Sequence, residues 1–382
     1  MTVVAGLAGL AAAMGIGRFA FTPLLPLMQA EFGLPLAQGA WLATLNYAGY
    51  LLGALASFVA APQPRRAARW GLLLVALTTL AMATTTSYVA WAVLRFAAGA
   101  ASAFALVGVS GWALGQLNAA GRAEWAGGVF AGVGSGIVMA GLVALGVGAA
   151  GQGARPAWLV LGAIAAAIAV LTWRAFAAPE PEAGNVTAAA SASPRLDASA
   201  WVLVVSYGIF GLGYIIPATF LPVIARSVVA DPAVFGWAWP LFGAAAALST
   251  VAVGRLLPRA SPRRVAAGSL CVMAAGVVAP SLAMSPVAIV ISAVCVGGTF
   301  MVVTMAGLQE ARRISHGAPA RLMSGMTAAF ALGQLAGPVL VSSASDVAGA
   351  IIGPSLLAAA LLLASALALY LDPGSRSKSA PI

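Results

Sequence analysis

The chain has 382 residues, of which 62% are apolar and only 7% are charged. A soluble domain is about half apolar and about a quarter charged, so this composition excludes a soluble globular fold. The apolar content also excludes a disordered chain, and two cysteines exclude a disulfide-rich secreted scaffold. A membrane-spanning helix needs ~20 mostly apolar residues, which leaves room for about twelve such helices.

The formal net charge of +10 does not indicate a nucleic-acid site, because the basic residues stand between apolar runs and do not cluster with stacking aromatic residues. Cys271 and Cys295 both fall inside apolar runs, and the single histidine, His316, falls in a loop. These residues cannot assemble an ordinary zinc site or a disulfide framework. We therefore expect no metal, no cofactor and no nucleic-acid partner.

Apolar runs bounded by Pro, Gly or charged residues predict two sets of spanning helices. The first set lies at about 3–30, 38–61, 70–87, 88–114, 125–150 and 156–178. The second set lies at about 200–228, 235–257, 265–284, 286–311, 321–344 and 347–371. The first run has no basic n-region before it, so we expect a retained spanning helix and not a cleaved signal peptide.

A Pro-, Ala- and Ser-rich stretch separates the two sets and has the composition of a linker. The predicted organisation is an N-terminal six-helix bundle, a cytoplasmic linker, a C-terminal six-helix bundle and a cytoplasmic tail, at residues 1–178, 179–199, 200–372 and 373–382. With the N-terminus inside, fifteen of the 19 basic residues fall on the inner side, and only Arg155 and Arg226 fall outside. The positive-inside rule therefore predicts that both termini are cytoplasmic.

The two halves repeat each other. Residues 15–26 read GIGRFAFTPLLP and residues 211–222 read GLGYIIPATFLP, at an offset of 196. Gly136 and Gly333 correspond at the nearly equal offset of 197. A parallel duplication of six helices is how the halves of major facilitator transporters are related, with the substrate site between them.

The chain resembles a major facilitator superfamily transporter over essentially its whole length. Its first two helices, GIGRFAFTPLLPLMQAEFGL and WLATLNYAGYLLGAL, resemble the YbfB/YjiJ-type group of bacterial transporters. The resemblance implies an all-α membrane protein of twelve transmembrane helices in two pseudo-symmetric six-helix halves. It also implies a multi-pass, monomeric protein of the bacterial inner membrane, and it names no cargo.

Two further motifs bear on coupling and gating. The run RFAAGAASA is similar to the superfamily's membrane-embedded Arg-x-x-x-Gly pattern, which Arg95 and Gly99 match and which is linked to proton coupling in drug/proton antiporters. The run GRLLPRASPRRV, with Arg255, resembles the loop that closes the cytoplasmic side, although Pro258 stands at its acidic position. No carboxylate lies in the middle of an expected helix, so Glu310 is the nearest candidate for a coupling proton, and an ion pair with a neighbouring arginine is the alternative.

Arg18 lies deep in the first apolar run, about fifteen residues from its start, which places it near the middle of a ~30 Å hydrocarbon core. Arginine there costs at least ~2.5 kcal/mol, so such a residue usually faces a cavity. Thr22 and Gln29 share its helical face. Arg18 either binds substrate or braces the helix by bonding the carbonyls that Pro23 and Pro26 free.

Other polar residues could face the same cavity. Asn46 and Tyr50 follow one face of the second helix, and Tyr47 flanks them. In the second half, Tyr214 occupies the repeat position of Arg18, and Gln334 is an isolated polar residue of the eleventh helix. We expect these five residues, together with Arg18 and Thr22, to bind substrate.

The absence of a carboxylate in the middle of the expected helices leaves Arg18 and Arg95 without a counter-ion and predicts an electropositive cavity. An anionic group on the substrate could supply the missing charge through a bidentate contact with arginine. The favoured hypothesis is a secondary transporter for a small organic anion or a zwitterion with a carboxylate. A proton is the candidate coupling ion. The alternative is an exporter of neutral amphipathic metabolites or drugs, in which both arginines are structural.

An enzyme is not expected, because the lone histidine lies in a loop and no acids pair within the membrane. The sequence has no GxxxxGK[ST] loop, so the chain carries no visible ATPase of its own.

Overall fold

The structure is a computed structural model, and it describes residues 1–177, 197–228, 236–256, 260–315, 319–341 and 347–372. The described part is helical, with thirteen α-helices, one π-helix and two short 3-10 helices. The described residues do not include most of the expected linker, the expected tail, His316 or Pro258. They include Arg226 without its side chain.

The first rod of the bundle consists of three successive helical segments. These are α1 (Thr2–Leu10), the π-helix η1 (Ala11–Phe19) and α2 (Phe21–Phe32). A π-helix breaks the regular α-helical hydrogen-bond ladder and is frequently found at functional sites. The rod ends at Gly33, whose φ of 65° lies in the left-handed region that glycine adopts without strain.

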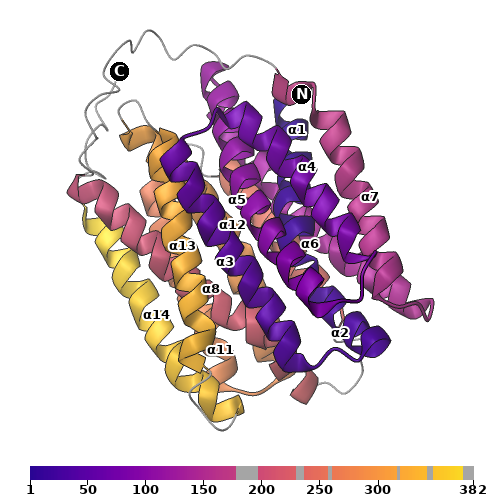
Figure 1. The fold of residues 1–382 in the computed structure, drawn as a ribbon. Helices are drawn as coiled ribbons and strands as arrows, with labels where there is room; N and C mark the ends of the chain where they lie inside the picture. Colours follow the sequence, from indigo (N-terminus) through magenta and orange to yellow (C-terminus); the bar gives the residue numbers. More distant parts are fainter. Residues whose placement is uncertain (178–196, 229–235, 257–259, 316–318, 342–346, 373–382) are drawn as a thin grey trace, which may run out of the picture.

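The other helices follow in chain order (Figure 1). The N-terminal half contains α3 (Leu36–Ala60), α4 (Pro64–Met82), α5 (Tyr88–Ala119), η2 (Ala123–Trp125), α6 (Ala126–Ala149), α7 (Ala154–Thr172) and η3 (Ala175–Ala177). The C-terminal half contains α8 (Ala198–Val228), α10 (Ala238–Leu256), α11 (Pro262–Leu282), α12 (Pro286–Ile314), α13 (Pro319–Val341) and α14 (Val347–Leu371).

Each expected run contains a helix in the described part of the chain. Nine of these helices are long and apolar enough to cross a membrane by length and composition, and the total of twelve crossings stays a prediction. The bounds differ most at α4, which begins at Pro64 and not at residue 70. Proline is favoured in the first helical turn, where its missing N–H costs no hydrogen bond, so the arginines that follow it lie inside the helix.

The halves meet most extensively at two helix pairs, α3 with α13 (Figure 1) and α6 with α10, and further contacts join α12 to α6 and α13 to α5. Glycines on α6 allow its backbone to touch α10. A Cβ at Gly141 would lie 2.9 Å from Pro240, and a Cβ at Gly134 would clash with the backbone of Gly243 and Ala247. Small residues at such contacts let helix backbones approach closely.

The basic residues gather at one end of the bundle, which we call the arginine-rich end. Its members in the described residues are Arg65, Arg66, Arg69, Arg122, Arg174, Arg255, Arg263, Arg264, Arg312, Arg313 and Arg321. At this end α5 and α12 meet, because Arg312 Nη1 donates to the carbonyl of Gly111 at 3.0 Å. At the opposite end, the backbone N–H of Arg155 donates to Glu31 Oε2 at 3.1 Å.

Candidate functional site

Arg18 lies where the two halves meet, on the π-helix of the first rod. Its side chain is buried, with 2% of its surface exposed. Arg18 Nη2 donates a hydrogen bond to Gln334 Oε1 on α13, across the boundary between the halves. Its Nε and Nη1 groups have no hydrogen-bond partner among the described residues. Two N–H donors of a buried cation are therefore available.

Aromatic rings surround this guanidinium. Its Cζ lies 3.9 Å from the ring centroid of Tyr50 and 5.4 Å from that of Tyr47, both on α3. The rings of Phe19 and Phe330 follow at 5.5 and 5.7 Å. Cation–π contacts at these distances partly offset the loss of hydration, but they do not neutralise the charge.

Arg95 on α5 forms hydrogen bonds with the backbone of the π-helix. Its Nη1 and Nη2 donate to the carbonyl oxygens of Gly17 and Arg18, at 3.4 and 3.2 Å. Asn46 Nδ2 donates in turn to the carbonyl of Arg95 at 2.9 Å. The alternative role for Arg18 was to bond helix carbonyls that Pro23 and Pro26 free. In the structure it is Arg95 that bonds helix carbonyls, and these belong to the π-helix, which ends before Pro23. This chain of contacts fixes the position from which the Arg18 side chain extends.

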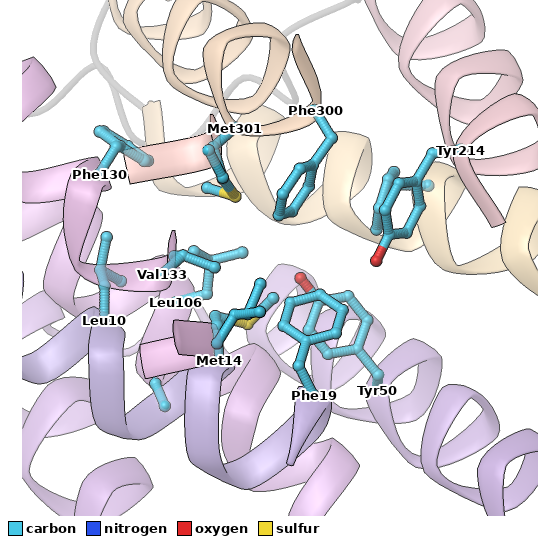
Figure 2. Close-up of a cluster of buried hydrophobic side chains, with 14 of the residues drawn as sticks. Leu10, Met14, Phe19, Tyr50, Leu106, Phe130, Val133, Tyr214, Phe300 and Met301 are labelled. Atoms are coloured by element: carbon cyan, nitrogen blue, oxygen red, sulfur yellow. The ribbon is translucent and has the colours of Figure 1, made fainter. Parts of the chain in front are cut away.

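Tyr214 faces the site from the C-terminal half. Its ring stacks on Phe300, with centroids 5.1 Å apart and planes at 17°, and on Phe330, at 6.0 Å and 25°. Phe19 meets Tyr214 edge-on at 6.4 Å. Figure 2 shows that the hydroxyl ends of Tyr50 and Tyr214 each lie on the side of the ring that faces the opposite half.

The site carries positive charge only. Among the described residues, Glu310 is the one fully buried acid, and it pairs with Arg263 and Arg313. No ion pair within the described part of the chain involves Arg18 or Arg95. Arg18 and Arg95 therefore make the centre electropositive, as the sequence predicts.

A second buried arginine lies at the arginine-rich end. Arg263 at the start of α11 bonds Glu310 Oε1 at 2.6 Å and also pairs with Asp372. Its Nη2 donates to the hydroxyl of Ser199, at the start of α8, at 2.7 Å. These contacts fasten α8, α11, α12 and the end of α14 to one another.

The structure brings together most of the residues that the sequence nominates for binding. Arg18, Tyr47, Tyr50 and Gln334 are in direct contact, and Tyr214 borders them. Thr22 is half-buried on α2, beyond the end of the π-helix. The prediction that Arg18 and Thr22 share a helical face assumes regular α-helical spacing. Arg18 lies on a π-helix, whose wider turn changes the direction of its side chain relative to that of Thr22.

The nominated coupling and gating residues do not form one cluster. Gly99 lies against α3, where a Cβ would clash with the carbonyl of Asn46, so its lack of a side chain serves close packing. Glu310 and Arg255 belong to the arginine-rich end, away from Arg18. Glu310 makes the ion pairs that the alternative interpretation expected.

A cleft of about 440 Å³ opens between the halves at the arginine-rich end. Its polar lining consists of Asn118, Glu124, Gln309, Arg312 and Arg313. The first two belong to the N-terminal half and the last three to α12. The cleft thus follows the boundary on which Arg18 and Gln334 also lie.

Sequence reasoning missed two groups of residues. The phenylalanines around the site, Phe19, Phe300 and Phe330, look like ordinary lipid-facing residues in an apolar run. Arg263 looks like one more loop arginine, although the structure buries it. The one signal in the sequence for the burial of Arg263 was Glu310, because an acid at the end of an apolar helix requires a cation as its partner.

Comparisons with known proteins agree with this architecture. The chain is similar in structure to the human organic anion transporter MFSD10 (TETRAN), with a TM-score of 0.69 and 14% sequence identity. The similarity covers 96% of this chain and 98% of the human chain, and at that identity it shows the fold alone. No curated protein matches the chain.

A family model described as "Uncharacterised MFS-type transporter YbfB" matches residues 10–370. The match extends over both halves, including the π-helix, α3 and α13. Members of such a family are transporters and not enzymes. The chain belongs to this family of major facilitator transporters, and it is a multi-pass membrane protein.

Proposed function

We propose that the chain is a secondary active transporter for a small organic solute with a carboxylate, either an anion or a zwitterion. The observation that carries this proposal is Arg18, a buried cation with two unpartnered donors and no counter-ion among the described residues. A planar guanidinium binds a carboxylate in a bidentate manner. An arriving carboxylate would supply the charge that the site lacks.

Arg18 and Gln334 connect the site to alternating access. One belongs to the N-terminal half and the other to the C-terminal half, and they already share a hydrogen bond. A carboxylate bound to both side chains would change the free energy of contact between the halves. Such a differential contact is what a ligand needs in order to shift a conformational equilibrium.

We assign substrate binding to Arg18, Thr22, Asn46, Tyr47, Tyr50, Tyr214 and Gln334, and coupling or gating to Arg95, Gly99, Arg255 and Glu310. The two moving bodies would be residues 1–178 and 200–372. The positive-inside rule supports a bacterial inner-membrane protein with both termini and the arginine-rich end in the cytoplasm. The cleft at that end would then be the cytoplasmic mouth of the pathway.

A second function has one observation in its favour. Arg18 already bonds Gln334 and lies over Tyr50, and aromatic rings dominate its surroundings. An exporter of neutral amphipathic compounds would use these rings and would keep Arg18 and Arg95 as structural residues.

A thermal-stability screen on detergent-purified protein, followed by liposome uptake, separates the two functions. A ligand that binds the folded state raises its stability by RT ln(1 + [L]/Kd). Carboxylates should stabilise the unsubstituted protein and should have no effect on Arg18→Ala. Arg69→Ala is the matched control, because Arg69 bonds the carbonyl of Trp173 away from the site. Stabilisation by neutral compounds or cations that persists in Arg18→Ala would overturn the anion function.

A further inference from the structure

The rings beside Arg18 continue into a longer aromatic stack, which we call the ring column. It contains Phe330, Tyr214, Phe300, Phe242 and Trp239. After the two contacts of Tyr214, Phe300 and Phe242 stack at 5.2 Å and 30°, and Phe242 and Trp239 at 5.5 Å and 5°. The five residues come from α13, α8, α12 and α10, so four helices of the C-terminal half each contribute to one stack.

The ring column and the free donors of Arg18 share a boundary. Phe330 stacks on Tyr214 and also lies 5.7 Å from Arg18 Cζ. Phe19, the neighbour of Arg18 in sequence, meets Tyr214 and Phe300 edge-on at 79° and 84°. A carboxylate on Arg18 therefore has stacked aromatic faces one ring away.

The charges at this boundary limit what the substrate can carry. The groups of Arg18 and Gln334 that have no hydrogen-bond partner are Arg18 Nε and Nη1 and Gln334 Nε2, and all three are N–H groups. The described residues offer no carboxylate here for an ammonium group, and the nearest buried charges, Arg18 and Arg95, are both positive. An ammonium group would lose its hydration and would gain no ion pair. The three donors match one carboxylate.

From these contacts we infer that the preferred ligand is an aromatic monocarboxylate without an amino group, whose carboxylate binds Arg18 and Gln334 and whose ring joins the ring column. This inference rests on the proposed function and narrows it, since zwitterions and aliphatic anions should bind more weakly than aromatic monocarboxylates. The ring gains offset-stacked and edge-on contacts that a saturated ring of the same size cannot make.

Two pairs of probe ligands test the inference on the unsubstituted protein. Benzoate and cyclohexanecarboxylate carry the same charge and the same number of carbons, and they differ in aromaticity. We expect benzoate to bind about fivefold more tightly, the size of one favourable aromatic contact. The second pair, 3-phenylpropanoate and phenylalanine, differs by one ammonium group. We expect phenylalanine to bind at least about tenfold more weakly.

Variants locate the effect in the ring column. Phe300→Leu and Phe242→Leu each remove a ring and keep an apolar side chain. We expect both to reduce the preference for benzoate over cyclohexanecarboxylate to about twofold or less. Phe130→Leu is the matched control, because Phe130 is equally buried on α6 and contributes to no ring contact in the described structure. This control should keep the full preference.

The outcomes distinguish the inference from the function on which it rests. Equal binding of benzoate and cyclohexanecarboxylate, both lost in Arg18→Ala, would overturn the ring column and leave the anion transporter intact. Phenylalanine that binds as tightly as 3-phenylpropanoate would overturn the expected weaker binding of zwitterions. No binding by any carboxylate, or binding that persists in Arg18→Ala, would overturn the proposed function itself. The ligand comparisons need no variant, so a poorly folded variant does not affect them.

Discussion

Arg18 and Arg263 are both buried arginines, with 2% and 1% of their surface exposed, but they differ in how their charge is balanced. Arg263 pairs with two carboxylates and bonds a serine, so its charge is neutralised within one half of the molecule. Arg18 has a neutral amide and aromatic rings around it, and it joins the two halves. One arginine belongs to a local ionic network, and the other has no ion pair among the described residues.

The difference follows from the cost of burying charge. Removal of one partner of a buried ion pair is strongly destabilising, because it leaves the other charge buried and uncompensated, whereas a buried charge without an ionic partner pays for its desolvation with no Coulombic attraction in return. Removal of a paired arginine should therefore destabilise the fold, while removal of an unpaired arginine should not. A chain that keeps an unpaired arginine at the boundary between its halves retains free energy that an anion can recover.

The same substitution at the two positions should give opposite results. Arg263→Met removes the buried cation that pairs with Asp372 and leaves Glu310 paired with Arg313 in the described structure. We expect it to lower the free energy of unfolding by about 3–5 kcal/mol. The measurement is thermal or denaturant unfolding in detergent. Arg264→Met is the control, because Arg264 follows Arg263 in the chain and its side chain is exposed, and an equal loss there would contradict a specific role for Arg263.

Arg18→Met removes a buried charge without leaving a partner charge behind. We expect the unliganded protein to unfold at an unchanged or higher temperature, within about 1 kcal/mol of the unsubstituted protein. Carboxylate affinity should fall by about 2–3 kcal/mol, the value of hydrogen bonds to a charged group. Titration calorimetry measures the second effect on the same samples. A large loss of stability with carboxylate binding intact would make Arg18 a structural residue like Arg263.

Gln334→Glu tests whether the missing charge is the decisive difference. The new carboxylate would pair with Arg18 and make this site resemble that of Arg263. We expect carboxylate affinity to fall about tenfold, because the internal acid competes with the ligand for the same donors. Gln334→Met is the control, since it removes the hydrogen bond without adding charge, and its loss should be only about 1 kcal/mol. Equal losses in both variants would show that hydrogen bonding, and not charge, matters at this position.

The sequence predicts much of this comparison, but not all of it. Composition, the positive charges and the internal repeat predict the helices and place Arg18 and Gln334 among buried polar residues. The contact between them depends on how two halves dock, and no local pattern specifies it. The π-helix was not predicted either, because the run from Ala11 to Phe19 has no residue that excludes an α-helix, and its carbonyls are satisfied by Arg95 from a distant helix.

Aromatic residues show the same limit from another direction. Phenylalanines face lipid, core or cavity with equal ease, so the positions of Phe300 and Phe330 could be known only after α8, α12 and α13 were placed beside one another. Arg263 illustrates the converse error. A loop arginine near a helix end is usually exposed, and its burial here depends on acids that come 47 and 109 positions later in the chain.

Arg95 is the third buried arginine, and its substitution should have the smallest effect of the three. It has no ion pair in the described structure, but its guanidinium bonds two backbone carbonyls of the π-helix and holds it in place. A lysine keeps the charge but presents it as a single compact group, so it should keep only one of the two bonds. We expect Arg95→Lys to lower the free energy of unfolding by about 1 kcal/mol and to change carboxylate affinity by less than about threefold. Hydrogen exchange at the amides of residues 11–19 should rise in this variant and stay unchanged in Arg18→Met. A loss of carboxylate affinity as large as that of Arg18→Met would instead place Arg95 in contact with the ligand.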